Sequence, residues 1–574
     1  KPRCCSEASD RMRCGAWVAR RRAERSHVVV TNHAFVLLDP RFFQNLIADE
    51  CDHLHAQAKS AASVELSLRR VRDDVDHVAA EGAASRGLLA ALERELGGGF
   101  AEPSAPLAAA LRSARGASGA ARDALRRLER CAAIYASFAA ERRRETGEDS
   151  PSSFLLFATS SASAPELLDA RVALAAALSE LSGACETIPS LLPGDAIPGA
   201  KRFATRFQQS AMDLAETAEE VEAWLPVRNG ALAFDPSSFH DLETDGPRGH
   251  AIGRRTLLLP NEWLGRRYFP GLQSVVLVSA SNWLRRGFDL ARAYLGLDLL
   301  EEGSEERPPR AVATYRSPPT FDYSRVLLAV PSDVPQARFG DAESRAPFDR
   351  YLVDFLRFLV ERTRGRTLAL LTNLQQCRSV GRALAPFFRE RRIPFLWQGM
   401  EGRAKEELPR LFRSADGGLL MGVDTFWYGV DFPGDLLEFL VVAKLPFGSL
   451  DRYMRAQRAA LGQSEHHRRI YLPEALAMFR QGCGRLMRRE TDRGAVFLLD
   501  PRVLQRWRLF LDELPGRDPD LDDDRRLVEM TGPTEECVRA ALAHCGRLEE
   551  CRRLGLDLRF APAAADRARS TFDE

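Results

Sequence analysis

Residues 42–54, with the sequence FFQNLIADECDHL, place a short apolar run directly before two carboxylates. The run Leu46–Ala48 predicts a buried parallel strand, so Asp49 and Glu50 would lie at its carboxyl end, the edge where open α/β sheets bind ligands. Mg²⁺ prefers one or two carboxylates with water and phosphate oxygens. Asp49 could therefore hold the metal while Glu50 orients or deprotonates an attacking water. Strand-end acids that cap the next helix would give the same pattern.

The second half of the chain carries more signals of the same kind. Short apolar runs end in polar residues, and the segments between them are long enough for helices, which predicts parallel βαβ construction. We therefore predict an α/β fold with two parallel sheets. The strands are expected at Ser274–Val278, Thr367–Leu371, Gly418–Met421, Glu438–Ala443 and Ala495–Leu499.

The segment from about residue 56 to 240 has a different composition, rich in Ala, Leu, Arg and Glu. Its apolar positions recur every three and four residues, the period of amphipathic helices, so a helical insertion is predicted. The same periodicity would suit a bundle that binds a protein partner. Gly97–Gly99 and residues 102–106 are expected to form a loop between long helices.

Residues 481–489, QGCGRLMRR, bring two arginines close together in sequence. Arg485 and Arg488 lie three apart after Gly484, and on one helical turn this spacing would aim both guanidinium groups in a common direction. Such a pair suits a polyphosphate, because guanidinium groups match phosphate oxygens and stabilise charge on a transferring phosphoryl group. Surface arginines without a ligand are the alternative interpretation.

Length and composition narrow the class of protein. A chain of 574 residues with 45% hydrophobic content predicts about three or four domains. Eleven scattered cysteines argue against a disulfide framework, and no apolar stretch approaches the roughly twenty residues of a membrane span, so we expect a cytoplasmic protein without a membrane partner. With a net charge of +1, a surface that binds nucleic acid would have to come from local clusters such as Arg20–Arg22 and Arg142–Arg144. Solvated helix faces are the alternative interpretation of these clusters.

Taken in chain order, these strings resemble the DinG/XPD-type family of superfamily-two DNA helicases. Residues similar to the family's DEAH, Ser-Ala-Thr, FWEGVD and QxxGRxxR motifs are Asp49–Asp52, Ser279–Ser281, Phe426–Asp431, and Gln481 with Gly484, Arg485 and Arg488; Lys444–Phe447 and Leu499–Arg502 also look like this family.

The resemblance implies an ATP-dependent DNA helicase that uses Mg²⁺, moves 5′ to 3′ on single-stranded DNA, acts on forked or duplex DNA in repair or replication, and has possible repair or replication protein partners. It implies catalytic roles for Asp49, Glu50, Arg485 and Arg488, nucleotide binding by Gln481, Gly429 and Asp431, and coupling of ATP to DNA by Asp52, Ser279 and Ser281.

The implied fold is α/β, with two RecA-like parallel-sheet motor domains, an inserted all-helical arch domain and a remnant iron–sulfur segment. The expected divisions are residues 1–55 for the end of the iron–sulfur segment and part of the first RecA-like domain, 56–250 for the insertion, 251–300 for the remainder of the first domain, 301–515 for the second domain and 516–574 for a C-terminal extension.

The start of the chain resembles the family's cluster segment. Cys4, Cys5 and Cys14 precede GAWVAR, similar to the last cluster cysteine and the helix after it. The resemblance implies a 4Fe-4S cluster, for which thiolates are the usual ligands. Cys14 is the clearest ligand, Cys5 or Cys4 would be another, and the set in this chain is incomplete. Free thiols would give the same sequence.

Several residues depart from the family pattern. Asp52 stands where the family has His and cannot donate as imidazole does. Tyr428 replaces Glu, and Ser281 replaces Thr. Neither Gly-Lys-Thr nor Gly-Lys-Ser, which ends the family's phosphate-binding loop, occurs in the chain. We expect a C-terminal portion that hydrolyses ATP poorly alone. A degenerate, non-catalytic scaffold for DNA or protein, or a motor attached to a nuclease, are the alternatives.

Two further expectations concern burial. Phe426 and Trp427 are predicted to pack in the core instead of stacking on bases. In the tail, the spacing of Cys537, Cys545 and Cys551 predicts buried positions on helices.

Overall fold

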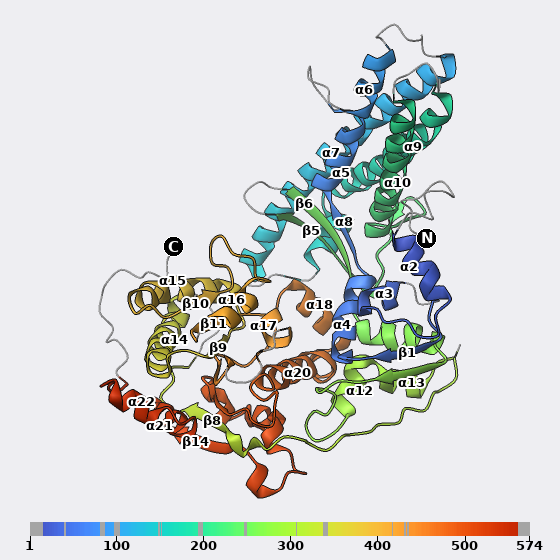
Figure 1. Ribbon diagram of the computed structural model, residues 1–574. Coiled ribbons are helices and arrows are strands. Elements are labelled where there is room, and N and C mark those ends of the chain that lie inside the picture. Colours follow the sequence, from blue (N-terminus) through green and yellow to red (C-terminus); the bar gives the residue numbers. More distant parts are fainter. Residues whose placement is uncertain are drawn as a thin grey trace. The chain divides into compact units, whose positions relative to one another are not determined.

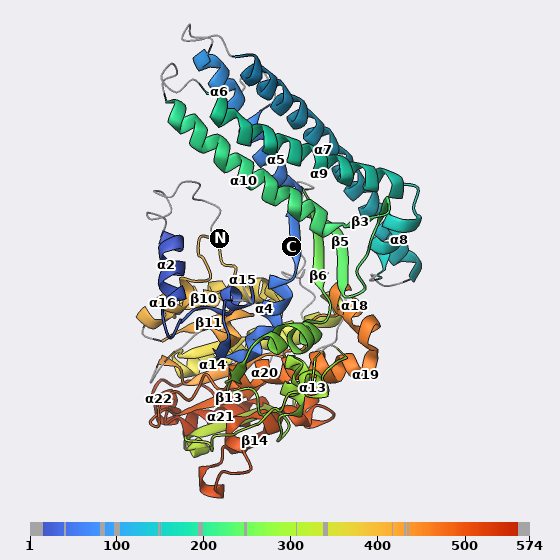
Figure 2. The ribbon, with the colours of Figure 1, turned by 90° about the vertical axis from the view of Figure 1, so that its right-hand side faces the viewer.

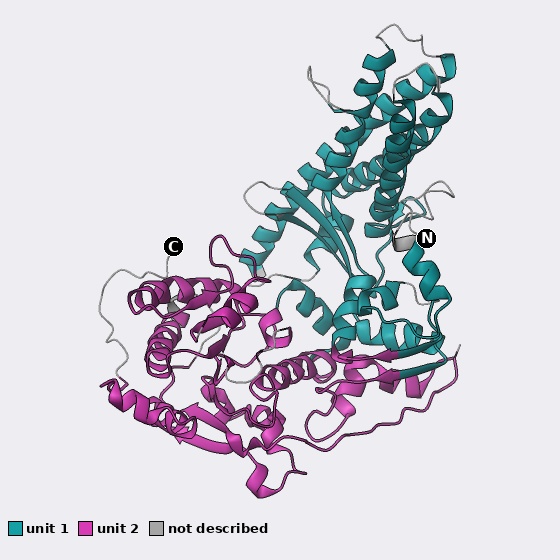
Figure 3. Ribbon diagram, viewed as in Figure 1, with its two compact units in different colours: residues 1–46, 53–275, 450–463 teal, residues 47–52, 276–449, 464–574 magenta. Residues whose placement is uncertain are grey.

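The computed structural model describes residues 15–38, 42–80, 87–96, 104–146, 150, 152–192, 199–245, 250–305, 307–336, 342–415, 417–429, 432 and 436–560. The chain forms two compact units (Figure 3). Unit 1 comprises residues 1–46, 53–275 and 450–463, and unit 2 comprises residues 47–52, 276–449 and 464–574.

Unit 2 is built on a seven-stranded sheet in which every neighbouring pair of strands is parallel (Figure 1). Across the sheet the order is β10 (Phe395–Trp397), β11 (Leu419–Gly422), β9 (Thr367–Leu370), β12 (Phe439–Val442), β13 (Gly494–Leu498), β8 (Val326–Pro331) and β14 (Val528–Gly532). All four strands predicted in this half are confirmed to within one residue at their ends.

Helices cover both faces of this sheet. On β8, Leu327 and Ala329 join a core with α14 (Ala342–Thr363), α15 (Leu374–Glu390) and α21 (Thr534–His544). Val326 and Leu328 join a second core with α16 (Leu408–Ser414), α17 (Thr425–Tyr428) and α20 (Leu472–Cys483). Burial on both faces explains why β8, β9, β11, β12 and β13 are nearly continuous apolar runs, whereas the edge strand β14 has exposed residues such as Val528. The helices of unit 2 are α12 (Asp289–Leu295), α13 (Leu297–Glu302), α14 (Ala342–Thr363), α15 (Leu374–Glu390), α16 (Leu408–Ser414), α17 (Thr425–Tyr428), α19 (Gln463–His466), α20 (Leu472–Cys483), α21 (Thr534–His544) and α22 (Leu548–Arg553).

The tail continues this unit. β14 pairs with β8, and α21 contributes Cys537 and Val538 to the core, so residues beyond 515 extend the sheet. Cys537 and Cys551 are buried, as their spacing predicts, whereas Cys545 is half-buried.

The strand predicted before the carboxylates is present as β1 (Asn45–Ala48), paired with β7 (Ser274–Leu277) in a two-stranded sheet. The prediction of a fully buried strand is wrong. Leu46 and Ala48 are buried, but Ile47 is 76% exposed, because side chains alternate between the two faces of β1 and described residues cover only one of these faces.

Unit 1 contains the predicted helical insertion. Figure 2 shows α7 (Ala105–Thr146), α9 (Ala164–Leu191) and α10 (Ala200–Trp224) running side by side as long helices around an Ala- and Leu-rich core. The helices of this unit are α2 (Gly15–Glu24), α3 (His33–Leu38), α4 (Leu54–Ala61), α5 (Leu68–Val78), α6 (Leu88–Glu95), α7 (Ala105–Thr146), α8 (Ser153–Ser160), α9 (Ala164–Leu191), α10 (Ala200–Trp224), α11 (Pro260–Trp263) and α18 (Arg452–Leu461). Residues 97–103 of the predicted loop lie outside the described residues, and α7 has begun by Ala105.

The expectation of an all-helical insertion is wrong at its two ends. β2 (Val64–Ser67), β6 (His250–Leu257) and β5 (Ser238–Asp245) form an antiparallel sheet, and β3 (Val227–Arg228) pairs with β4 (Ala231–Leu232). β2 lies in a stretch with helical periodicity, but pairing with β6 decides its conformation. A Cβ on Gly253 would lie 2.4 Å from the Trp224 ring, so glycine is what lets α10 approach β6.

α18 belongs to unit 1 although unit 2 residues flank it in sequence. Arg452 contacts both carboxylate oxygens of Asp241 at 2.8 and 3.0 Å, and also Glu243 at 3.0 Å and the Tyr135 hydroxyl at 2.8 Å. Gln457 donates to the Leu258 carbonyl at 2.6 Å. Within the described ranges, no helix combines the length and apolar character of a membrane span.

Candidate functional site

The four residues Asp49–Asp52, called the carboxylate box below, follow β1 in a strained turn. Asp49 and Glu50 are exposed, and the Asp49 Oδ1 atom accepts from the Glu50 amide at 3.0 Å. Glu50 has φ +49°, a left-handed conformation that non-glycine residues seldom adopt. The Cys51 amide donates to the Val278 carbonyl at 3.0 Å and ties the turn to the neighbouring segment. Strain of this kind persists where the surroundings hold it, often at functional sites.

The buried Cys51 side chain fixes the carboxylate box to the segment that follows β7. Its thiol lies 3.2 Å from the side-chain nitrogen of Asn282, just after the Ser-Ala-Ser motif. Burial raises the pKa of Cys51 to about 12, so the group stays a neutral thiol that packs and does not act as a nucleophile. Asn282 has no distinguishing sequence pattern, and sequence reasoning did not single it out.

The three residues assigned to coupling are brought together. The Ser279 hydroxyl donates to the Asp52 carboxylate at 2.8 Å, and the Ser279 and Ser281 hydroxyl oxygens are 2.9 Å apart. The Ser281 amide also donates to the Ser279 oxygen at 3.2 Å. Asp52 can only accept, and here a serine hydroxyl supplies its donor. The box and the Ser-Ala-Ser motif are thus joined by side chains.

Gln481 reaches the box from α20. Its side-chain nitrogen donates to the Glu50 Oε2 atom at 3.1 Å. α20 continues directly from a π-helical turn at His467–Tyr471, and it buries Leu476 and Phe479 against the sheet. This packing leaves Gln481 half-buried on the helix's last turn, where it can contact the carboxylate.

The two motif arginines do not share a helical turn, so that part of the prediction is wrong. α20 ends at Cys483, and the chain then turns, with the Asp492 carboxylate accepting from the Arg488 and Arg489 amides at 2.8 Å each. Arg485 is 7% exposed and donates to the Trp427 carbonyl at 3.2 Å and to the Tyr428 carbonyl. Arg488 is exposed instead.

The aromatic motif packs as predicted. Phe426 and Trp427 are buried, and the Trp427 ring nitrogen donates to the Leu371 carbonyl at 2.8 Å. A Cβ on Gly482 would lie 2.5 Å from the Trp427 ring, so α20 approaches α17 through this glycine. The Gly429 amide donates to the Thr425 carbonyl at 2.7 Å and closes α17.

Some predicted site residues fall outside the described part of the chain. These are Asp431 and the three proposed cluster ligands Cys4, Cys5 and Cys14. Among the residues that are described, no three His, Cys, Asp or Glu side chains gather as a metal-binding group.

The exposed carboxylates of Asp49 and Glu50 nevertheless suit Mg²⁺ in their chemistry. Mg²⁺ beside nucleotides takes one or two carboxylates and completes its shell with water and phosphate oxygens, so a cluster of three protein ligands is not required. The donor set therefore fits the ion.

Arg480 is a neighbour that sequence reasoning missed. Its Nε atom donates to the Ala280 carbonyl at 2.9 Å, and its Nη1 atom lies 3.8 Å from a carboxylate oxygen of Glu513. Burial raises the pKa of Glu513 to about 7, because that side chain is only 1% exposed. A single buried ion pair between distant segments leaves no periodic signal that a sequence could show.

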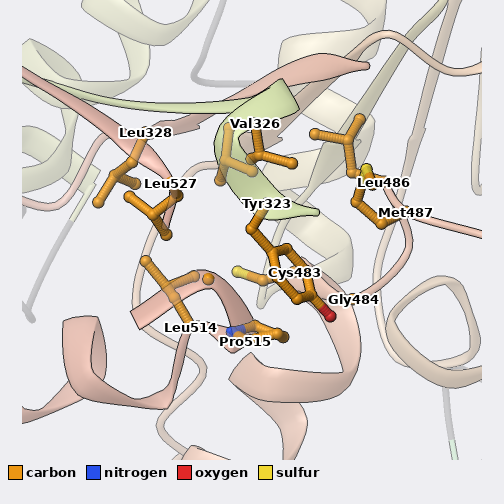
Figure 4. A pocket seen from close by; sticks show the side chains of 12 residues that line it. Tyr323, Val326, Leu328, Cys483, Gly484, Leu486, Met487, Leu514, Pro515 and Leu527 are labelled. Carbon is orange, nitrogen blue, oxygen red and sulfur yellow. The ribbon is translucent and has the colours of Figure 1, made fainter. Parts of the chain in front are cut away.

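A small cavity of about 30 Å³ is lined on one side by the residues Cys483, Gly484, Leu486 and Met487 (Figure 4). Its walls include Cys483, Tyr323 and Leu514, and they are largely apolar. A space of this size holds about one water and offers such a water few polar partners, so it is a packing defect instead of a ligand pocket.

Comparison with known proteins finds relatives for part of the chain. Residues 356–517 match the family described as helicase C-terminal domain. The chain is 29% identical over 287 residues to the 3′-5′ exonuclease DinG of Bacillus subtilis. The aligned region covers 49% of this chain and 29% of that protein. It is 35% identical over 194 residues to the ATP-dependent DNA helicase YoaA of Escherichia coli, covering 33% of this chain and 29% of that protein.

The chain thus spans about three tenths of the length of these curated relatives. A solved structure named "XPD_APO" aligns with 84% of this chain and 76% of its own, at 11% identity and a TM-score of 0.40.

Proposed function

This chain is a relative of the DinG/XPD-type superfamily-two DNA helicases, and from that premise we propose that it carries the ATP-hydrolysing and coupling residues of an ATP-dependent DNA helicase. The observation that supports this most directly is the hydrogen bond from Gln481 to Glu50. It joins the carboxylate box to the QxxGRxxR-like segment within one compact unit, as a nucleotide site built from both would require.

Each side chain then has a role in phosphoryl transfer. Glu50 orients or deprotonates the attacking water, and Gln481 fixes the direction of that carboxylate. Asp49 would hold Mg²⁺, which neutralises charge on the phosphate oxygens when it is bound.

The arginines act on the phosphate side. Arg488 is exposed at the end of the segment after α20 and can approach the nucleotide directly. Arg485 holds the Trp427 and Tyr428 carbonyls at the end of α17, so it would either exchange these for phosphate oxygens or keep the neighbouring Gly429 in place for the nucleotide.

Coupling to DNA would run through the serine motif. Asp52, Ser279 and Ser281 form one hydrogen-bonded group, so a change at the box moves the loop that follows β7. The relative YoaA is named an ATP-dependent DNA helicase. For this chain we propose single-stranded DNA and forked or duplex DNA as substrates, with 5′ to 3′ movement in repair or replication. We also propose a 4Fe-4S cluster on Cys14 with Cys5 or Cys4; its test is visible absorbance and iron content in Cys14→Ser beside wild type.

A non-catalytic scaffold is the second candidate. Two observations favour it: the Arg485 guanidinium is already engaged by backbone carbonyls, and Tyr428 stands where a charged residue is expected. A scaffold would bind DNA or protein without turnover.

The deciding experiment is ATP hydrolysis by the full product of the gene, with and without single-stranded DNA. Glu50→Gln should lower DNA-stimulated turnover by about 100-fold or more, the usual contribution of a positioned base. The matched control is Glu490→Gln, which changes an exposed glutamate on the turn after the arginines. Absence of turnover in well-folded wild type would leave the scaffold as the function.

A further inference from the structure

Arg480 occupies a place between two segments that are far apart in sequence. It precedes Gln481 on α20, and its side chain is 17% exposed. The Nε atom donates to the carbonyl of Ala280, the central residue of the serine motif, at 2.9 Å. The Nη1 atom lies 3.5 Å from the backbone oxygen of Glu513 and 3.8 Å from its carboxylate.

Glu513 holds the same loop from its other end. It closes a 3₁₀ helix at residues 508–513, and its Oε1 atom accepts from the Arg285 amide at 2.7 Å. Arg285 and Arg286 have φ values of +51° and +61°, two successive left-handed residues that are not glycine. Such a turn is costly and persists only where its surroundings hold it. Two backbone hydrogen bonds between Leu284 and Gly287 close the turn, and the bond from the Arg285 amide to Glu513 ties it to the 3₁₀ helix.

These contacts close a ring. Glu50 accepts from Gln481, whose chain neighbour Arg480 donates to Ala280; the next residue back, Ser279, donates to Asp52 in the box where the ring began. Every member lies in unit 2. A ring of this kind transmits displacement, because a shift of α20 moves the box through Gln481 and the serine loop through Arg480 together.

We propose that Arg480 and Glu513 are a positioning pair that locks the Ser279–Gly287 loop to α20, so that the loop follows the nucleotide-dependent position of Gln481. The coupling of the loop to nucleotide rests on the proposed ATP-dependent function, whereas the attachment of the loop to α20 does not. Arg480 touches no reacting atom in this role. It acts through Ala280 and Glu513. Its guanidinium must donate to the Ala280 carbonyl from one edge while another nitrogen faces the Glu513 carboxylate.

The shape of the guanidinium makes the proposal specific. Arginine presents donors in a rigid planar fork, whereas lysine offers a single ammonium that cannot reach the carbonyl and the carboxylate with the same geometry. Arg480→Lys should therefore keep the charge and most of the buried volume but lose the lock. A role in general packing or charge balance would instead be largely restored by lysine.

The first test is amide hydrogen exchange on the full product of the gene without nucleotide. In Arg480→Ala and Arg480→Lys, peptides covering residues 279–287 should exchange about tenfold faster than in wild type, the scale of one lost hydrogen bond to a charged group. Arg389→Ala, which removes an exposed arginine on α15, should leave these peptides unchanged. Unchanged exchange in both Arg480 variants would overturn the proposal.

The second test separates this inference from the proposed function. With DNA-stimulated hydrolysis present in wild type, Arg480→Lys should lower the kcat of the stimulated reaction about tenfold while KM for ATP changes less than about twofold. Full rescue by lysine would overturn the coupling role. Wild type without any hydrolysis would defeat the proposed function, yet the exchange experiment would still decide whether Arg480 and Glu513 lock the loop.

Discussion

The side-chain amide of Gln481 donates to the Glu50 carboxylate at 3.1 Å, a contact between residues 431 positions apart. Glu50 is presented for it by a left-handed backbone, φ +49°, immediately after a strand. Gln481 is presented by the last turn of α20, whose buried face fixes its rotation about the helix axis. The two motif segments Asp49–Asp52 and Gln481–Arg488 therefore meet through side chains, and substitution of Gln481 tests the candidate site directly.

Removing this contact should impair catalysis without unfolding the protein. In Gln481→Ala the Glu50 carboxylate loses its donor, and we expect stimulated kcat to fall about 10- to 100-fold, as for a misaligned catalytic group. Because both side chains are at least partly exposed, the midpoint of thermal unfolding should change by no more than a few degrees. Steady-state hydrolysis and calorimetry on the same preparation measure the two quantities. An equal fall for Gln463→Ala, a glutamine at the start of α19, would show that the loss is not specific.

Glu513 should make the stability of unit 2 depend on pH. Burial raises its pKa to about 7, against an ordinary value of 4.5, even though Arg480 and the Arg285 amide favour the charged form. A raised pKa contributes stability that is fully present below 4.5 and is lost as the pH rises through 7. The loss is at most about 3–4 kcal/mol for a shift of this size.

Urea unfolding from pH 5 to pH 8 measures this effect in wild type and in Glu513→Gln. The free energy of unfolding of wild type should fall relative to the variant as the pH rises, since glutamine does not titrate. The neighbouring acid Asp512 is present in both proteins, so its titration largely cancels in the difference. Parallel curves for the two proteins would contradict the assignment.

How far the sequence predicts this structure depends on whether a feature is periodic. Four parallel strands of unit 2, β9, β11, β12 and β13, were predicted to within one residue, whereas β8, β10 and β14 were not predicted. The burial of Trp427 was also predicted. The exposure of Ile47 could not be predicted, because it depends on whether other residues cover the second face of β1. The segment Val64–Ser67 has helical periodicity but pairs with β6, so tertiary pairing overrides the local pattern.

The candidate site shows the same division. Motif resemblance selected Asp52, Ser279 and Ser281, and the structure brings them within hydrogen-bonding distance of one another. It did not select Arg480 or Glu513, whose importance comes from burial of opposite charges on segments with no shared pattern. Spacing alone also placed Arg485 and Arg488 on a common helical turn, which the end of α20 at Cys483 rules out.

In unit 1, Arg452 should be the main attachment of α18. The Asp241 side chain is only 3% exposed and is paired with Arg452, so Arg452→Ala leaves a buried carboxylate without its cation. Breaking one partner of such a pair costs about 3–5 kcal/mol. We expect that loss in the unfolding free energy of unit 1. Arg458→Ala on the same helix is the control, and Arg452→Ala combined with Asp241→Asn should recover part of the loss. Equal stability of both single variants would contradict this account.

Two glycine substitutions should change stability in opposite directions. At Gly482 a Cβ would lie 2.5 Å from the Trp427 ring, so Gly482→Ala must push α20 away from α17 and should destabilise unit 2 by about 1–3 kcal/mol. At Gly116, inside α7, a Cβ would meet no atom within 4 Å, and Gly116→Ala should stabilise unit 1 by about 0.5–1 kcal/mol through helix propensity. Because α20 also carries Gln481, Gly482→Ala should lower stimulated hydrolysis as well, whereas Gly116→Ala should not. Calorimetry with hydrolysis assays on both variants tests the pair, and a Gly482→Ala protein with wild-type stability and turnover would show that α20 does not depend on its close approach to Trp427.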